Sequence, residues 1–500
     1  MIIVVIGGCG FVGTSLAREL LHEGATVHIF DREPPPSSLL NISTGGGIRY
    51  HRGSVTDYNK MVSLFLSIKP DVVIHLASYG MSGGPMLQKG TCNHVNVLGV
   101  GLLLAAMKVG QVVHLVYVST YNVVYGGEKI ENGDESMEHY PLEGHTDFYG
   151  PSKAMAENAV ISANGMNGMK TCVIRPAAIY GEGEQRHFPR IVSHIDRGIF
   201  KFRIGTESIV DWVHVENLTQ SLLLAVEGLT SKGKGSAPCG QCYFISDGTP
   251  LDNFEFLRPL LEVRGEAFPS IVLPVPFALA IGWVCEVIYK CSSAIGLPIE
   301  PFLTRAEVYK VGKSHYFSID KAERDLGYSP TINSTDGAKI MAREYALCGA
   351  KGENTRFFRI VSPVWYLPIL GGMFACYCVA FTTPSQWQAV GPVYATIMQA
   401  LLKVGLLLFQ TQFMLRMVFI AAVAAHALEA FYAYRVCITI ECSSTCVLWI
   451  LQTFVFGFPS LRMLLARRDL YLHLKEKRQV SCKGHAKSTR VYDGPWWGRR

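Results

Sequence analysis

Short runs of apolar residues alternate with helical patterns over the first 120 residues of the chain. The runs are rich in Val and Ile and indicate buried parallel strands, whereas apolar residues spaced three or four apart indicate helices between them. The predicted strands are residues 2–6, 26–30, 71–76 and 113–118, and the predicted helices are residues 13–22 and 95–107. This alternation predicts an α/β fold with a doubly wound parallel sheet of the Rossmann type.

After residue 175 the predicted elements become shorter, and Pro and Gly interrupt them. We expect residues 1–175 to form the sheet domain, and residues 176–348 to form a smaller substrate-binding lobe together with elements that return to the sheet. Residues 271–299 are mostly apolar but contain three prolines, Glu286 and Lys290, which makes a poor membrane-spanning helix. Two interpretations stay open for this segment: a hydrophobic lid, or a segment that dips into a membrane interface.

The character of the chain changes again after a polar linker at residues 349–356. Residues 357–468 are predicted to form a bundle of about four transmembrane helices, since four apolar segments each approach the length that crosses a bilayer. These segments are residues 360–381, 393–409, 414–434 and 445–466, of which 393–409 is the shortest and contains Lys403. The basic tail 469–500 and a loop at 382–392 without Lys or Arg predict that both ends lie in the cytosol. The alternative is that some of these segments are core helices of a soluble domain.

Composition and charge argue against a nucleic-acid partner and exclude few other classes of function. The net charge is +6, from 46 basic and 40 acidic residues, and no stripe of Lys and Arg interleaves with aromatic residues, so no nucleic-acid partner is predicted. The chain has 14 cysteines, and we expect free thiols in a reducing compartment, with no metal site. It starts with MIIVVIGG, which indicates a strand and not a signal peptide and predicts a cytosolic first domain.

A glycine-rich loop follows the first predicted strand. In GGCGFVG, Gly7 permits a tight turn, Gly10 lets a pyrophosphate approach the backbone, and Gly13 lets the following helix pack closely on the sheet. Asp31 closes the second predicted strand, where its carboxylate would accept hydrogen bonds from an adenosine ribose. The negative charge of Asp31 favours NAD as the cofactor, although Arg32 beside it leaves NADP as the alternative.

The Gly-x-x-Gly-x-x-Gly spacing resembles that of the extended short-chain dehydrogenases. The resemblance implies that Phe11 and Val12 of the loop also contact the cofactor, and that Asp57 in RGSVTD contacts adenine. It further implies that the chain passes under the cofactor in VIHLAS, and that a helix containing NVLG braces the active site. The residues implied in these two stretches are Leu76, Ala77 and Asn96.

Tyr149 and Lys153 in YGPSK lie four residues apart, which places both on one face of a helix. A nearby ammonium lowers the pKa of a phenol, so we predict Tyr149 as the general base, with Lys153 lowering its pKa and binding the nicotinamide ribose. The stretch VYVST resembles the position of the family's third catalytic residue, which aligns the reacting oxygen. Thr120 is predicted to fill this role, and Ser119 is the alternative.

The stretch RPAAIYGEGEQRH at residues 175–187 resembles the 3β-hydroxysteroid dehydrogenases and related sterol dehydrogenases, and implies that Pro176 and Ile179 border the nicotinamide. Further similar stretches begin at Asp211, Phe244 and Leu303, so the resemblance covers about residues 1–345. The segment after residue 357 resembles a small multi-span membrane family without a known activity. Together these features predict an enzyme that oxidises the 3β-hydroxyl of a steroid or sterol with NAD.

Two other functions stay open: a nucleotide-sugar epimerase or reductase of the same superfamily, and a cofactor-binding membrane scaffold or sensor without turnover. The predicted partners are a lipophilic substrate and a lipid bilayer, and an oligomer is compatible with the sequence. An endoplasmic reticulum membrane is the expected location, and a mitochondrial membrane is the alternative.

Overall fold

The computed structural model describes residues 1–36, 39, 47–196, 200–231, 237–264, 266–294, 296, 298–348, 361, 365–439, 446–465 and 468. The chain divides into two compact units. The first, called the α/β unit here, comprises Met1–Ile191 and Lys201–Arg343, and the second comprises Glu344–Thr489 with Val192–Phe200. The predicted linker 349–356 and the basic tail 469–500 lie outside the described residues.

A seven-stranded parallel sheet forms the centre of the α/β unit, in the order β12-β7-β5-β4-β1-β2-β3. The strands are β1 (Ile2–Ile6), β2 (Thr26–Asp31), β3 (Ile48–Arg52), β4 (Val72–His75), β5 (His114–Val118), β7 (Lys170–Pro176) and β12 (Gln241–Ile245). The order reverses next to β1, as a doubly wound sheet requires, and the predicted Rossmann-type fold is confirmed.

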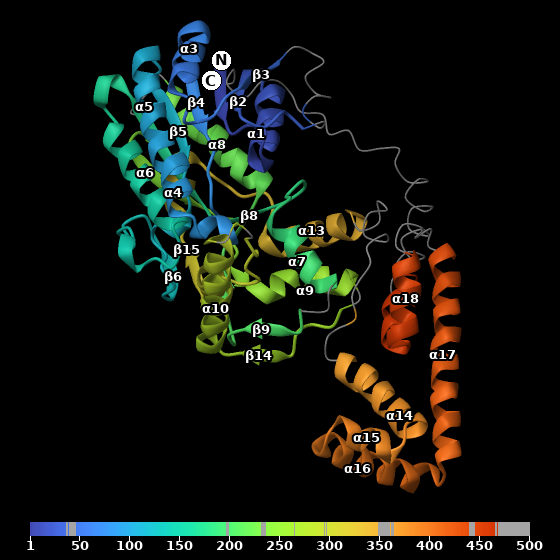
Figure 1. Cartoon of the computed structure of the whole chain (residues 1–500). Coiled ribbons are helices and arrows are strands. Elements are labelled where there is room, and N and C mark those ends of the chain that lie inside the picture. Colours follow the sequence, from blue (N-terminus) through green and yellow to red (C-terminus); the bar gives the residue numbers. More distant parts are fainter. Residues whose placement is uncertain are drawn as a thin grey trace. The chain divides into compact units, whose positions relative to one another are not determined.

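Both faces of this sheet are covered by helices, because successive residues of each strand point to opposite faces and both sets are apolar. Helices α1 (Phe11–His22) and α8 (Val215–Thr230) pack on one face, against Ile3, Val5 and Val116 among others. Helices α3 (Tyr58–Ile68), α5 (Gly99–Gly110) and α6 (Tyr149–Ala163) pack on the other face. Figure 1 shows the sheet between these two helical layers.

The lobe that follows β7 consists of short strands and helices, as its sequence predicts. A four-stranded sheet has the order β13-β10-β15-β6. Two further sheets have two strands each, β8 with β11 and β9 with β14. The strands are β6 (Ile130–Gly133), β8 (Ala178–Tyr180), β9 (Phe202–Ile204), β10 (Ile209–Val210), β11 (Trp212–His214), β13 (Leu251–Asp252), β14 (Ile271–Leu273) and β15 (His315–Phe317). The helices are α7 (His187–Asp196), α9 (Asn253–Val263), α10 (Val275–Ala294), α11 (Arg305–Gly312), α12 (Asp320–Leu326) and α13 (Ser334–Cys348).

The predicted boundary at residue 175 does not separate two bodies. Strand β12 and helix α8 return to the main sheet, and β6, which lies before the boundary, pairs with β15 of the lobe. These exchanges merge residues 1–175 and most of residues 176–348 into one compact unit.

The second unit is helical. Its elements are η8 (Leu367–Gly371), α14 (Gly372–Phe381), α15 (Pro384–Val390), α16 (Pro392–Phe409), α17 (Gln412–Thr439) and α18 (Cys446–Phe456). All four predicted apolar segments contain helix, but among the described residues only α16 and α17 of this unit are long and apolar enough to cross a membrane. The segments 360–381 and 445–466 contain shorter apolar helices, Pro368–Phe381 and Cys446–Phe456, and the start of each segment lies partly outside the described residues. The predicted loop 382–392 contains α15, whose first turn is closed by Thr383 and Gln386.

The eleven cysteines whose side chains are described are all free, as expected. Among the described residues no group of His, Cys, Asp and Glu has an arrangement that suits a metal ion.

Candidate active site

The predicted site residues gather at the carboxyl edge of the main sheet, because parallel strands place all their carboxyl ends on one side. The glycine loop follows β1, Asp31 ends β2, Leu76 and Ala77 follow β4, and Thr120 follows β5. Pro176 ends β7, and Ile179 lies in β8 directly after it. Five chain segments that are distant in sequence thus meet at one edge.

The glycine loop requires glycine at two of the three predicted positions. Gly7 has a φ of +83°, and a Cβ there would lie 2.7 Å from the backbone nitrogen of Ala77. A Cβ on Gly13 would lie 2.5 Å from the Cα of Gly8, so this residue allows α1 to approach the loop. Gly10 precedes the first turn of α1, where Phe11 and Val12 begin the helix.

Asp31 holds the glycine loop in place. Its Oδ2 accepts a hydrogen bond from the backbone nitrogen of Cys9 at 2.9 Å, and its Oδ1 accepts one from that of Glu33 at 3.0 Å. Each carboxylate oxygen has a further lone pair, so these bonds leave acceptor capacity for ribose hydroxyls. The exposed Arg32 lies 3.3 Å from the Glu33 carboxylate, which competes with a 2′-phosphate for the guanidinium.

Asn96 joins two segments at this edge of the sheet. It is buried in η3 (Asn93–Leu98), and its side chain exchanges two hydrogen bonds with the backbone of Tyr79, at 2.8 and 2.9 Å. Its Nδ2 also donates to the Ser152 hydroxyl of α6 at 2.8 Å. One amide thereby joins the loop after β4 to the helix that carries Tyr149.

Asp57 caps a helix in the structure. Its side chain accepts from the backbone nitrogen of Lys60 at 3.2 Å at the start of α3, and it pairs with the Lys60 ammonium. The predicted contact with adenine stays a prediction.

Tyr149 is the first residue of α6 and is buried. The hydroxyls of Ser78 and Thr120 lie close enough to its phenol to lower the pKa of that group. Thr120 accepts from the Asn122 side chain at 2.7 Å, a bond that does not use its own hydroxyl proton. Of the two hydroxyls in VYVST, Thr120 therefore contacts the proposed base.

Ser119 belongs to a different network. Its hydroxyl donates to the carboxylate of Glu157, which is fully buried and also accepts from Arg175 at 2.6 and 3.0 Å and from His139 at 3.0 Å. These donors hold the pKa of Glu157 at about 2, although burial opposes them. Glu157 lies two turns beyond Tyr149 on α6, so this cluster fixes the helix against β5 and β7.

Burial acts on the charge state of Tyr149 and Lys153. Burial raises the pKa of Tyr149 to about 12, although Ser78, Thr120 and Arg186 each act to lower this pKa. Burial lowers the pKa of Lys153 to about 7, partly offset by Glu157. The Lys153 ammonium donates to the carbonyl of Val118 at 2.7 Å and lies over the ring of Tyr117. The ammonium is thus directed to β5 and desolvation disfavours both charged forms, and the lowering of the Tyr149 pKa by Lys153 stays a prediction.

Two functional residues were not identified from the sequence. Ser78 follows the HLA stretch, and its role depends on the bend of the chain after β4. Arg186 lies in the stretch RPAAIYGEGEQRH and is exposed; it is the cation that lowers the pKa of Tyr149. The long loop after β8 brings it there, and local spacing contains no signal for that.

The geometry fits a dinucleotide. The glycine loop excludes side chains on its inner side, an N-terminal helix turn follows it, and Asp31 is already oriented by two backbone amides. The glycine loop and Asp31, which were predicted to bind the cofactor, would hold it at this edge of the sheet. Tyr149 and Lys153 lie at the same edge.

Comparison with known proteins agrees with this geometry. The model of the 3-beta hydroxysteroid dehydrogenase/isomerase family matches residues 4–275, and the model of transmembrane protein 254 matches residues 364–466. The human short-chain dehydrogenase/reductase family 42E member 1 is 42% identical over 333 residues, which cover 65% of this chain and 83% of that protein. The 3 beta-hydroxysteroid dehydrogenase/Delta 5-->4-isomerase of Mycobacterium tuberculosis is 35% identical over 337 residues, covering 66% of this chain and 87% of that protein.

Solved structures share the fold of the α/β unit. The UDP-glucose 4-epimerase of Thermotoga maritima has a TM-score of 0.53 and 21% identity, over 70% of this chain and 99% of its own. A dTDP-glucose 4,6-dehydratase from Bacillus anthracis, in complex with NAD, has a TM-score of 0.54 and 17% identity, over 70% and 97%. The apolar helices of the second unit and the match to a transmembrane protein indicate that the chain associates with a membrane.

Proposed function

Because the chain belongs to the 3-beta hydroxysteroid dehydrogenase/isomerase family, we propose that it oxidises the 3β-hydroxyl of a steroid or sterol to the ketone with NAD as its cofactor. The observation that carries this proposal is that Tyr149 and the hydroxyls of Ser78 and Thr120 lie close together at the carboxyl edge of the sheet, the edge that also has the glycine loop and Asp31. The relative from Mycobacterium tuberculosis, whose name specifies this activity, supports the substrate class.

Each residue of the group has a separate task. Thr120 donates a hydrogen bond that aligns the reacting oxygen, and Tyr149 takes the hydroxyl proton from the substrate. NAD supplies the chemistry of hydride acceptance when it is bound. In this proposal Lys153 would bind the ribose of the nicotinamide half, and Asp31 would bind the ribose of the adenosine half.

The charge balance predicts that proton abstraction favours alkaline pH. A phenol with a pKa of about 12 is almost fully protonated at neutral pH, so the rate of alcohol oxidation rises as the phenolate fraction increases. Arg186 favours the phenolate, which makes it a positioning charge for the base.

The second unit supports a membrane location near a lipophilic substrate. We assign the chain to the endoplasmic reticulum membrane as a multi-pass protein, with the α/β unit in the cytosol. Protease protection of intact microsomes, with antibodies against each unit, tests this orientation.

The test is NADH formation by the full-length, detergent-solubilised chain with a panel of 3β-hydroxysteroids and sterols. Tyr149→Phe and Lys153→Met variants are measured beside the wild type. We expect turnover by the wild type and a loss of most of the rate in both variants. UDP-glucose serves as a second substrate: conversion of this sugar alone would replace the dehydrogenase by an epimerase. If NAD binds but neither the wild type nor the variants convert any substrate, the chain would be a cofactor-binding scaffold.

A further inference from the structure

Helix α17 of the second unit has two ionisable side chains near its middle. The helix is 28 residues long and apolar enough to cross a membrane. At 1.5 Å per residue it is about 42 Å long, whereas the hydrocarbon core of a bilayer is about 30 Å thick. His426 lies about 20 Å from either end, and Glu429 lies one turn further on. A spanning α17 therefore places both side chains in the hydrocarbon core, where ionisable groups are rare and often functional.

A break in the neighbouring helix lies beside these two residues. Helix α18 stops at Gly457, which has a φ of +61°, and residues 458–465 are helical again. Such a break leaves carbonyls in the last turn of the first helix without partners in that helix. Buried polar side chains border the break: Gln452 and Thr453 each bond to the hydroxyl of Ser460, at 3.1 and 2.9 Å. In a membrane, freed backbone groups need partners of this kind or partners on neighbouring helices.

His426 is such a partner, and this contact fixes its tautomer. Its Nδ1 lies 3.0 Å from the carbonyl oxygen of Phe454 in the last turn of α18. A carbonyl can only accept a hydrogen bond, so Nδ1 carries the hydrogen and donates it. In the neutral imidazole the other ring nitrogen, Nε2, is then an acceptor.

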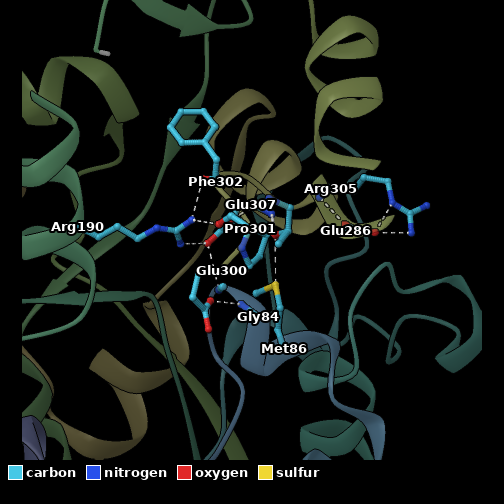
Figure 2. A network of polar contacts seen from close by, with 11 residues as sticks. Gly84, Met86, Arg190, Glu286, Glu300, Pro301, Phe302, Arg305 and Glu307 are labelled. Atoms are coloured by element: carbon cyan, nitrogen blue, oxygen red, sulfur yellow. Dashed lines mark hydrogen bonds and ion pairs between the residues drawn. The ribbon is translucent and has the colours of Figure 1, made fainter. Parts of the chain in front are cut away.

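The carboxylate of Glu429 faces the same point as this acceptor. A Cβ on Gly457 would lie 2.8 Å from Oε2 of Glu429 and 2.8 Å from Nε2 of His426, so the two atoms are no further apart than the sum of these distances. In the part of the chain that the structure describes, no donor contacts the Glu429 carboxylate. The carboxylates of Glu286 and Glu307 in the α/β unit, by contrast, each face an arginine guanidinium, as Figure 2 shows. At Gly457 two acceptors converge instead.

The helices around α17 do not supply a cation for Glu429. Helices α14 and α18, which contact α17, have no charged residue, and their titratable side chains are cysteines and Tyr377. The basic residues in the described part of this unit are Lys403 in α16, Arg416 and Arg435 toward the ends of α17, Arg462 and Arg468. None of them forms an ion pair with Glu429 among the residues described. An ionised carboxylate is unfavourable in apolar surroundings, whereas one proton removes the charge and supplies the missing donor.

From these observations we propose that His426 and Glu429 form a proton-binding site in the membrane-spanning part of the second unit, beside the break at Gly457. The ligand is a single exchangeable proton. On uptake it forms an O–H bond on the Glu429 carboxyl, which donates to Nε2 of His426, and on release the carboxylate is restored. The site is separate from the dehydrogenase chemistry of the α/β unit.

Labelling with dicyclohexylcarbodiimide tests the site in the full-length chain, reconstituted into phosphatidylcholine vesicles. This apolar reagent reacts with carboxyl groups that are protonated in apolar surroundings, and mass spectrometry locates the product. We expect labelling of Glu429 that falls about tenfold for each pH unit above the midpoint of proton release. The exposed Glu143 of the α/β unit is the control and is expected to stay unlabelled, and Glu429→Gln is expected to remove the labelled product.

Two variants test whether the proton is shared. His426→Phe removes the acceptor that stabilises the neutral carboxyl, so the midpoint of labelling is expected to move down by about one pH unit. Gly457→Ala places a Cβ between the two side chains and is expected to move the midpoint in the same direction. Gly391→Ala is its control, because Gly391 belongs to the same unit and has a φ of +147° but open space around it. This variant is expected to keep the wild-type midpoint.

Several results would overturn the proposal. Glu429 without label at every pH would be a permanently ionised carboxylate, and a midpoint that His426→Phe leaves unchanged or raises would mean that the proton is not shared. Protection from labelling by zinc, with zinc present in the purified protein, would assign the two side chains to a metal. The wild-type pH series needs no variant, so it decides even where a variant fails to fold. Because labelling does not require turnover, an inactive enzyme with labelled Glu429 would contradict only the proposed function.

Discussion

Thr120→Val and Ser119→Ala are predicted to have opposite consequences, because these adjacent hydroxyls belong to separate networks. The Thr120 hydroxyl lies close to the phenol of Tyr149 and lowers its pKa, whereas Ser119 donates to the buried Glu157 carboxylate. Removing one preorganised donor at a reacting oxygen lowers the rate about 100- to 1000-fold, which corresponds to ~3–4 kcal/mol of transition-state stabilisation. We expect this loss in kcat/KM for Thr120→Val.

Ser119→Ala is expected to affect stability more than rate. A hydrogen bond to a charged group contributes ~1.5–3 kcal/mol, so the free energy of unfolding falls by about that amount while kcat/KM stays within a few-fold of wild type. Thr120→Val also loses a cap of the short helix after β5, which is worth ~1 kcal/mol and too little to explain the rate. Thr120→Ser keeps the hydroxyl and is expected to retain most of the activity.

The assay is steady-state NADH formation, with a thermal unfolding curve for each variant in the same detergent. If Thr120→Val kept nearly full kcat/KM while Ser119→Ala lost a hundredfold or more, the assignment of the two hydroxyls would be reversed. If all three variants lost rate only in proportion to their unfolding, neither hydroxyl would act on the reacting oxygen.

Three further predictions follow from the site. Glu157→Gln leaves the buried Arg175 guanidinium without its carboxylate and is expected to lower the free energy of unfolding by ~3–5 kcal/mol. The pKa of Glu157 in the folded protein is about 2, below the ordinary 4.5, so the wild type loses this stabilisation as the pH falls from 4.5 to 2. A variant as stable as the wild type at neutral pH would contradict the importance of this ion pair. Arg186→Gln is expected to move the alkaline rise of kcat/KM up by about 0.4 pH unit, since an exposed charge contributes ~0.5 kcal/mol; an unchanged pH profile would show that Arg186 does not act on Tyr149. Gly7→Ala is expected to abolish NAD binding, measured by calorimetry, because its Cβ meets Ala77, whereas Gly24→Ala has a similar φ of +78° and open space and should bind normally; equal loss in both would indicate backbone strain alone.

Helix α10, whose buried side is small or polar and whose exposed side is large and apolar, illustrates how the two levels of information differ. The composition of residues 271–299 indicated a lid or a membrane-dipping segment and did not separate them. Periodicity reports that apolar residues share a face, but which face is buried depends on partners elsewhere in the chain. The carboxylate of Glu286 accepts from Arg305 and Tyr289 accepts from Gln88, and these contacts hold the polar side of α10 inward.

The second unit shows a limit of hydropathy. A window average recognises apolar stretches, and all four contain helix. It does not detect the interruption after α18, because that depends on local backbone conformation, the φ of +61° at Gly457.

The sequence by itself determined the doubly wound sheet, the glycine loop with Asp31, and the placement of Tyr149 and Lys153 on one helix. These features depend on strand and helix periods and on backbone positions that only glycine tolerates, all of which are local. Tertiary structure decided which hydroxyl contacts Tyr149, that Ser78 and Arg186 act on it, and that burial raises its pKa. Hydrogen-bond partners, desolvation and charge depend on distances between residues far apart in the chain, and these distances exist only after the chain has folded.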